Sequence, residues 1–174
     1  MHQTTNQGSD DMVKAKDGTR IRIRALQPED EDGLKRFYGR LSQSTMFLRF
    51  GRHKESVSEE WIERLIGMNH NGNIAVAAIG DASHDEILGI AAVVFDEKRR
   101  RGETSVLVAD QSQGKGIGRI VLEHAVSLAR ERGMESLWAL IDVENTPARN
   151  LAKKLGFVSA SPPAFGQQEF ELRF

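Results

Sequence analysis

The sequence predicts an α/β protein, a mixed α+β arrangement in which helices cover one mixed sheet. Three features of the 174-residue chain lead to this prediction. Two strand patterns joined by a short basic turn indicate a hairpin, and a glycine-rich loop separates a later strand from a long helix. After that helix, strands and helices alternate as in crossover connections. The expected order is β-α-α-β-β-β-α-β-α-β-β, which a doubly wound parallel sheet does not have.

The first third of the chain is expected to contain one strand and two helices. Residues 19–24 alternate between arginine and apolar or small residues, which predicts a strand with its arginines in solvent. A helix is expected to begin at Pro28, because proline and acidic residues favour the first turn. Ser58 has the pattern of an N-cap for a second helix. Between them, residues 41–50 contain two phenylalanines that we expect to lie in the core.

A β-hairpin is expected in the middle of the chain. Residues 74–79 and 86–96 have apolar strand patterns, and residues 98–102 (KRRRG) join the second of them to a strand near 105–109. The arginines are expected to form the exposed tip of this hairpin. A clamp for an acidic partner or for a phosphate group is the alternative interpretation.

The central feature is a strand, a glycine-rich loop and a helix in succession. The β-branched segment 105–109 precedes the loop 113–118 (QGKGIG), and an apolar stripe then runs from Ile117 to Ala129. Gly133 is placed to end this helix. The first amides of a helix have no internal partner and attract anions, and glycine lets a phosphate approach the backbone closely. The pattern therefore predicts an anion site.

The spacing of the loop excludes the common nucleotide motifs. Lys115 is followed by Gly116, which breaks the Walker A pattern, and a Rossmann fingerprint would need a third glycine where Arg119 or Val121 stands. The spacing Gln-x-x-Gly-x-Gly, met by Gln113, Gly116 and Gly118, instead resembles motif A of the GNAT superfamily of acyl-CoA-dependent N-acyltransferases. In that family the loop amides hold the pyrophosphate of coenzyme A.

The closing part of the chain carries a second resemblance to this family. After a strand at 137–143, Asn145 begins a helix that ends at Gly156, and the sequence resembles the family pattern N-x-x-A…L-G-F. Residues 158–160 and 168–174 are expected to pair as closing strands. The resemblance extends from Arg20 to Phe174. It implies a GNAT fold, with a mostly antiparallel central sheet flanked by helices and a splayed coenzyme cleft.

The resemblance also implies which residues bind acetyl-CoA, the expected co-substrate. Backbone groups of the central strand would stabilise the thioester oxygen and pair with the pantetheine arm, and Asn145 would support that arm, although it could serve only as a helix cap. The expected coenzyme-binding residues are Val106, Leu107, Val108, Gln113, Gly114, Lys115, Gly116, Ile117, Gly118, Arg119 and Asn145.

Acetyl transfer to an amine also needs a base, since an ammonium group has no lone pair. Glu103 lies ten residues before Gln113, where protein acetyltransferases of the Pat type, which act on acyl-CoA synthetases, have a catalytic glutamate. The alternative is that Glu103 neutralises the hairpin arginines. Residues 41–50 (LSQSTMFLRF) also resemble a motif of that subgroup. Many GNAT enzymes have a tyrosine acid where this chain has Ala152, so no acid is assigned.

Composition narrows the remaining possibilities. A net charge of −1 gives no electrostatic case for binding nucleic acid or membranes, and no apolar run is long enough to span a bilayer. Cysteine is absent, and the histidines lack metal-ligand spacing, so we expect no metal. Residues 1–17 are expected to be a mobile tail and residues 18–174 one catalytic domain. The N-terminus has no secretory pattern, which favours a cytoplasmic protein.

The sequence therefore predicts an acetyl-CoA-dependent N-acetyltransferase with Glu103 as general base. The acceptor is expected to be a protein lysine, on a target like an acyl-CoA synthetase. One alternative is acetylation of a small amine or amino acid, and another is a non-catalytic sensor that only binds acyl-CoA. The protein is expected to be a monomer or a homodimer.

Overall fold

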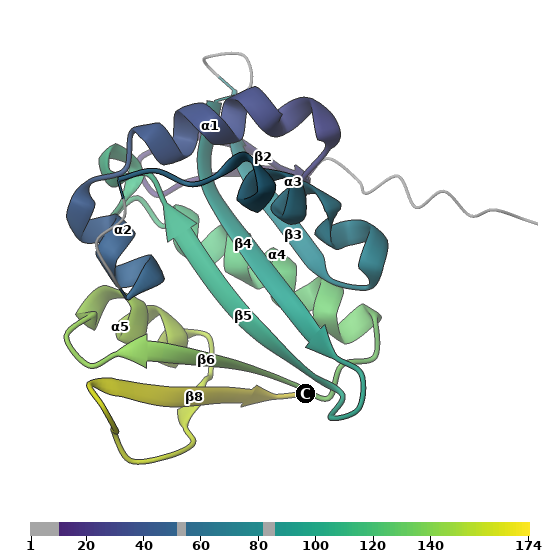
Figure 1. The fold of residues 1–174 in the computed structure, drawn as a ribbon, viewed down its shortest axis with the longest axis vertical. Coiled ribbons are helices and arrows are strands. Elements are labelled where there is room, and N and C mark those ends of the chain that lie inside the picture. Colours follow the sequence, from purple (N-terminus) through teal and green to yellow (C-terminus); the bar gives the residue numbers. More distant parts are fainter. Residues whose placement is uncertain (1–10, 52–54, 82–85) are drawn as a thin grey trace, which may run out of the picture.

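The strands form one mixed sheet, as predicted (Figure 1). The computed structural model describes residues 11–51, 55–81 and 86–174. Within these residues the strand order is β1-β2-β3-β4-β5-β6-β8-β7. Neighbouring strands are antiparallel except β5 and β6, which are parallel. The strands are β1 (Asp11–Lys14), β2 (Arg20–Ala25), β3 (Ile74–Gly80), β4 (Glu86–Asp96), β5 (Arg101–Val108), β6 (Ser136–Asp142), β7 (Val158–Ser159) and β8 (Gln167–Arg173).

Helices cover both faces of the sheet and make two separate cores. One core contains side chains from α1, α2 and α3, and the other contains side chains from α4 and α5. Every residue of β3 is buried, because this strand has a helical layer on each side. The helices are α1 (Glu31–Gly39), α2 (Gln43–Phe50), α3 (Glu59–Gly67), α4 (Ile117–Glu131) and α5 (Thr146–Lys154), with short 3-10 helices η1 (Pro28–Asp30), η2 (Met68–Asn71) and η3 (Asp110–Ser112).

Three predictions about the N-terminal third were wrong. The expected tail, residues 1–17, is structured from Asp11 onward, because β1 pairs antiparallel with β2 at the edge of the sheet; residues 1–10 lie outside the described residues. The segment 41–50 forms α2, in which Met46 is buried but Phe47 is 40% exposed. The phenylalanines there are therefore not all in the core, because only one side of this helix faces the sheet.

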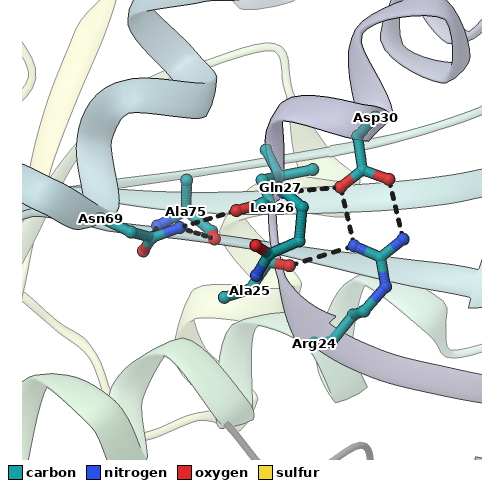
Figure 2. A network of polar contacts seen from close by, with 7 residues as sticks. All are labelled: Arg24, Ala25, Leu26, Gln27, Asp30, Asn69 and Ala75. Atoms are coloured by element: carbon teal, nitrogen blue, oxygen red, sulfur yellow. Dashed lines mark hydrogen bonds and ion pairs between the residues drawn. The ribbon is translucent and has the colours of Figure 1, made fainter. Parts of the chain in front are cut away.

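Arg24 was expected to lie in solvent with the other arginines of β2, and this was also wrong. Figure 2 shows its guanidinium in a two-pronged ion pair with Asp30, at 2.7 Å for both contacts. The same carboxylate accepts the backbone N–H of Gln27 at 2.7 Å. This network joins the end of β2 to the beginning of η1 and α1. Beside it, Asn69 bridges to the backbone of Ala75 (Figure 2).

Candidate active site

Strands β5 and β6 separate and leave a gap. Their pairing ends at Glu103, whereas β5 remains paired with β4 as far as Val108. The N–H of Ala109 donates to the carbonyl of Leu88 at 2.9 Å. In an antiparallel strand, every second residue forms its backbone hydrogen bonds with the same neighbouring strand. Since Ala109 bonds to β4, the residues that alternate with it, Val106 and Val108, direct their backbone groups away from β4. Their N–H and C=O groups therefore face the gap beside β6.

The glycine-rich loop, residues 113–118, brings helical amides to the end of this gap. Gly114 and Gly116 have φ angles of 76° and 86°, which L side chains rarely adopt. The first helical hydrogen bond runs from the N–H of Ile120 to the carbonyl of Gly116 at 3.2 Å. The N–H groups before Ile120 have no carbonyl one turn earlier in the helix, so they are available for an anion. A Cβ on Gly118 would lie 3.2 Å from Val108, so glycine here allows α4 to pack closely on β5.

A cavity of about 810 Å³ joins the gap to the loop. Its walls come from β5, β6, the glycine-rich loop, α2, α4 and α5, and Figure 1 shows α2 and α5 flanking the ends of β5 and β6. Among the residues predicted to bind coenzyme A, those in the wall are Val106, Leu107, Val108, Gln113, Gly114, Gly116, Ile117, Gly118, Arg119 and Asn145. Lys115 does not line the cavity, and its Nζ lies 3.5 Å from a carboxylate oxygen of Asp17.

Two of the predicted residues also hold the site together. The side-chain amide of Gln113 donates to the carbonyl of Val108 at 3.1 Å, which ties the loop back to β5. Asn145 caps α5, because its Oδ1 accepts the N–H of Ala148 at 3.1 Å. Asn145 also lines the cavity, and the cap uses only its Oδ1, so a structural role and a coenzyme contact are compatible.

Several other residues in the wall were not expected from the sequence. Thr45, Leu48 and Arg49 enter from α2, which lies on the opposite face of the sheet from α4. Lys16 enters from the segment after β1, where its backbone N–H donates to the carbonyl of Lys115 at 3.0 Å. These residues come together only because β1 and α2 pack beside the glycine-rich loop. The motif at 41–50 was the one signal that pointed to α2.

Asp110 links α2 to the start of the glycine-rich loop. Its carboxylate accepts the hydroxyl of Ser42 at 2.6 Å, the N–H of Ser42 at 2.9 Å and the hydroxyl of Thr45 at 2.8 Å. Burial alone would raise the pKa of Asp110, but these hydrogen bonds outweigh burial and hold the pKa below its ordinary value. Asp110 is therefore a charged anchor and a poor proton acceptor.

Glu103, the expected base, lies outside the cavity wall and is exposed. It is the last β5 residue paired with β6, and strand alternation places its side chain on the same face as that of Ser105, which lines the cavity. The hairpin arginines have other carboxylate partners: Asp96 for Arg99, Glu135 for Arg100 and Glu169 for Arg101. In the described residues, these three arginines thus pair with carboxylates other than Glu103. The arginines themselves lie at the end of β5 opposite the glycine-rich loop, where they cannot clamp a phosphate bound there.

A tyrosine acid is not in the wall. Ala152 is buried and lines the cavity, as the sequence led us to expect. Tyr38 is buried under α3, where its hydroxyl accepts the indole N–H of Trp61 at 3.1 Å and burial raises its pKa. Within the described ranges, no cluster of three or more histidine, aspartate or glutamate side chains could hold a metal ion. The helices of those ranges include none long and apolar enough to cross a membrane.

Comparison with other sequences agrees with this geometry. Residues 36–157 match the acetyltransferase (GNAT) family. An acetyltransferase of Pseudomonas aeruginosa is 27% identical over 148 residues, which are 84% of this chain and 80% of that protein. An L-methionine sulfoximine/L-methionine sulfone acetyltransferase of the same species is 34% identical over 88 residues, 48% of this chain and 51% of its own. An L-amino acid N-acyltransferase of Escherichia coli is 38% identical over 73 residues, 41% of this chain and 42% of its own. This chain thus spans about half the length of the last two.

Solved structures share the same fold. The GNAT domain of S. lividans PAT has a TM-score of 0.85 at 21% identity, covering 94% of this chain and 96% of that domain. A putative acetyltransferase of Salmonella typhimurium, solved with its cofactor acetyl-CoA, has a TM-score of 0.69 at 20% identity, covering 88% of this chain and 93% of that one. The chain therefore belongs to the acetyltransferase (GNAT) family and is an N-acetyltransferase that uses acetyl-CoA.

Proposed function

We propose that this acetyltransferase acts on the primary amino group of a small molecule. The cavity that runs from the glycine-rich loop to α2, about 810 Å³ in volume, has to hold the coenzyme as well as the acceptor. The support for a small acceptor therefore comes from the relatives. Two of the sequence relatives are named for amino acids or amino-acid analogues. Of the two acceptors predicted from the sequence, the small amine thus has the better support.

The proposed reaction is direct transfer. The amine nitrogen attacks the thioester carbonyl, a C–N bond forms, the C–S bond breaks, and coenzyme A leaves as a thiolate. The N–H groups of Val106 and Val108 point into the gap and would stabilise the negative charge on the thioester oxygen. The amides before Ile120 would hold the pyrophosphate. No side chain in the wall is assigned as acid, so the thiolate takes its proton from water.

We further propose that Glu103 removes the amine proton through one water molecule. Ser105 lies two positions further along β5, a rise of roughly 7 Å between Cα atoms, which the glutamate side chain and one water molecule together can span. Its carboxylate has no ion pair with any described residue. A base at this position would face the acceptor side of the sheet, where α1 to α3 lie.

The test is steady-state kinetics of Glu103→Gln, with Glu97→Gln as the control from the exposed hairpin tip. If Glu103 is the base, its variant should lose about 10²- to 10⁴-fold in kcat at neutral pH, while the KM for acetyl-CoA changes little. The loss should become smaller as pH rises, since more of the amine is then neutral. Equal losses in kcat and in coenzyme affinity would contradict the base role.

A protein lysine is the second candidate acceptor. Phe47 and Leu48 of α2 are 40% and 43% exposed beside the cavity, where they could contact a protein surface. Transfer of labelled acetyl groups into a cell lysate and into its small-molecule fraction separates the two. Label in a discrete protein band would replace the small-molecule proposal, and label in small molecules would support it. Tight binding of acetyl-CoA with no transfer to either would indicate an acyl-CoA sensor.

A further inference from the structure

We propose that Arg49 forms a carboxylate subsite in the cavity, so that the preferred acceptor is an amine that also carries a carboxylate, as an α-amino acid does. This inference rests on the small-molecule function proposed above and narrows its substrate class. It begins from the position of Arg49 in the cavity wall on α2, a helix that contributes to the core on the opposite face of the sheet from α4. The phosphates of the coenzyme and the carboxylate of the acceptor would thus be bound by different cationic side chains.

The guanidinium of Arg49 is held by aromatic rings of the described residues. Its central carbon lies over the ring of Phe50 at 5.5 Å and over the ring of Trp61 at 5.7 Å. Trp61 is itself held by the hydrogen bond to Tyr38. Among the described residues, no carboxylate pairs with Arg49. Aromatic faces restrict the group but do not use its N–H donors, which remain available for a planar, two-pronged contact with a carboxylate.

The helix that carries Arg49 is anchored to the glycine-rich loop. Asp110 holds Ser42 and Thr45 at the start of α2, so the position of Arg49 relative to the bound coenzyme is set by hydrogen bonds at one end of a short helix. A carboxylate anchored on Arg49 would consequently place its amine at a defined distance from the thioester. Positioning of this kind is a substantial part of catalysis in two-substrate reactions.

The charges of the cavity agree with such an acceptor. Lys16 and Arg119 stand at the glycine-rich loop, where they match the phosphates of the coenzyme. Asp142 is the carboxylate in the wall formed by the described residues, and its Oδ1 already accepts the N–H of Glu144 at 2.8 Å. A polycationic acceptor would find little acidic surface here. An amino acid presents its carboxylate to Arg49 and is acetylated at its amine.

The test measures KM for two variants of Arg49 with a matched panel of acceptors at saturating acetyl-CoA. The panel consists of the free proteinogenic amino acids and their α-carboxamides. The amides keep the reacting amine and lose only the negative charge. We expect the wild-type protein to prefer the acids, and Arg49→Met to raise the KM for the acids by about 30- to 100-fold while changing that for the amides less than about threefold. Arg49→Lys keeps the charge but not the two parallel N–H donors, so its KM for the acids should lie between those of the wild-type protein and of Arg49→Met.

Two controls separate this effect from damage to the fold. Arg64→Met removes an exposed arginine of α3 that is not in the cavity wall, and it should behave as wild type. Thermal unfolding with and without acetyl-CoA should show the same coenzyme-induced stabilisation in Arg49→Met as in wild type. A loss of that stabilisation would mean that Arg49 supports the coenzyme site, and it would overturn the subsite.

The outcomes distinguish the two proposals. If amides and simple amines are acetylated as well as acids, and Arg49→Met affects all of them equally, the carboxylate subsite is wrong but the small-molecule function stands. If no small amine is acetylated and the label enters proteins, both proposals are wrong. A preference for acids that disappears in Arg49→Met and partly remains in Arg49→Lys establishes the subsite.

Discussion

At the scale of single residues, Arg24 and Arg20 are two arginines of the same strand whose ion pairs should contribute very differently to the stability of the protein. Arg24 alternates with isoleucine in β2, as Arg20 does. Arg20 pairs with Asp81 at 3.2 Å with side chains 63% and 48% exposed, whereas the pair Arg24 and Asp30 is 16% and 6% exposed. Removing one partner of a buried pair leaves an uncompensated charge, whereas an exposed pair contributes little.

The substitution Arg24→Ala should therefore destabilise the protein by about 3 kcal/mol, because the carboxylate of Asp30 would remain buried with only the N–H of Gln27 as a close donor. Urea denaturation at neutral pH measures this. The matched control, Arg20→Ala, should cost about 0–1 kcal/mol. Equal losses in the two variants would show that the buried network contributes no more than a surface pair.

At the scale of elements, the link between η3 and α2 is the contact with the clearest consequence for the site. Asp110 follows the central strand, Ser42 begins α2, and the two residues are 68 positions apart in the chain. Their hydrogen bonds fix the position of the acceptor side of the cavity relative to its coenzyme side. A helix as short as α2 would not be stable without such tertiary contacts.

We expect Asp110→Asn to lower stability at pH 7 by about 1–2 kcal/mol, because an amide cannot accept all three hydrogen bonds. The pKa of Asp110 is lowered in the folded state, so its contribution is present above the unfolded value of about 3.9 and is lost as pH falls through the folded value. The difference between the variant and wild type should thus shrink below about pH 4. Denaturant unfolding at several pH values measures it, and a difference that does not depend on pH would contradict the charged anchor.

The same variant should also change kinetics at pH 7. If α2 positions the acceptor, the KM for the acceptor should rise more than the KM for acetyl-CoA. Asp32→Asn is the matched control, since it makes the same change at an exposed residue of α1 that does not line the cavity. An equal effect on both substrates would indicate general loosening of the site.

At the scale of the whole molecule, the N-terminal strand matters because it completes the coenzyme end of the cavity. β1 is an edge strand. The chain after β1 is joined to the glycine-rich loop by the hydrogen bond from the N–H of Lys16 to the carbonyl of Lys115. The alkyl chain of Lys16 passes close to Gly116, where a Cβ would lie 3.2 Å from its Cγ. The strand thus brings a cation to the place where phosphates are expected.

Lys16→Met should raise the KM for acetyl-CoA by about three- to tenfold at low salt, with a smaller difference at high salt because screening weakens the attraction. Initial rates over a range of salt concentrations measure this. Lys14→Met is the matched control, an exposed lysine of β1 that does not line the cavity. A change of equal size in both variants would assign the effect to overall charge.

The sequence predicted most of the architecture and about a third of the residues in the cavity wall. The expected strands and helices after residue 18 are present, including the parallel step from β5 to β6, because their patterns depend on neighbours in the chain. The family and its use of acetyl-CoA were likewise predicted, from the glycine spacing and from Asn145. Gly114, Gly116 and Gly118 could be recognised because backbone geometry demands glycine there.

What the tertiary structure alone decided is the acceptor side. Arg49 lies within the motif at 41–50, but that motif assigns it no role, and Asp110 is an ordinary polar residue that no periodicity distinguishes from solvent-exposed ones. They matter because elements distant in the chain pack against the loop. The loop motif is local, since one turn and one helix end suffice to bind phosphate. The choice of acceptor depends on long-range contacts, and only the folded chain contains them.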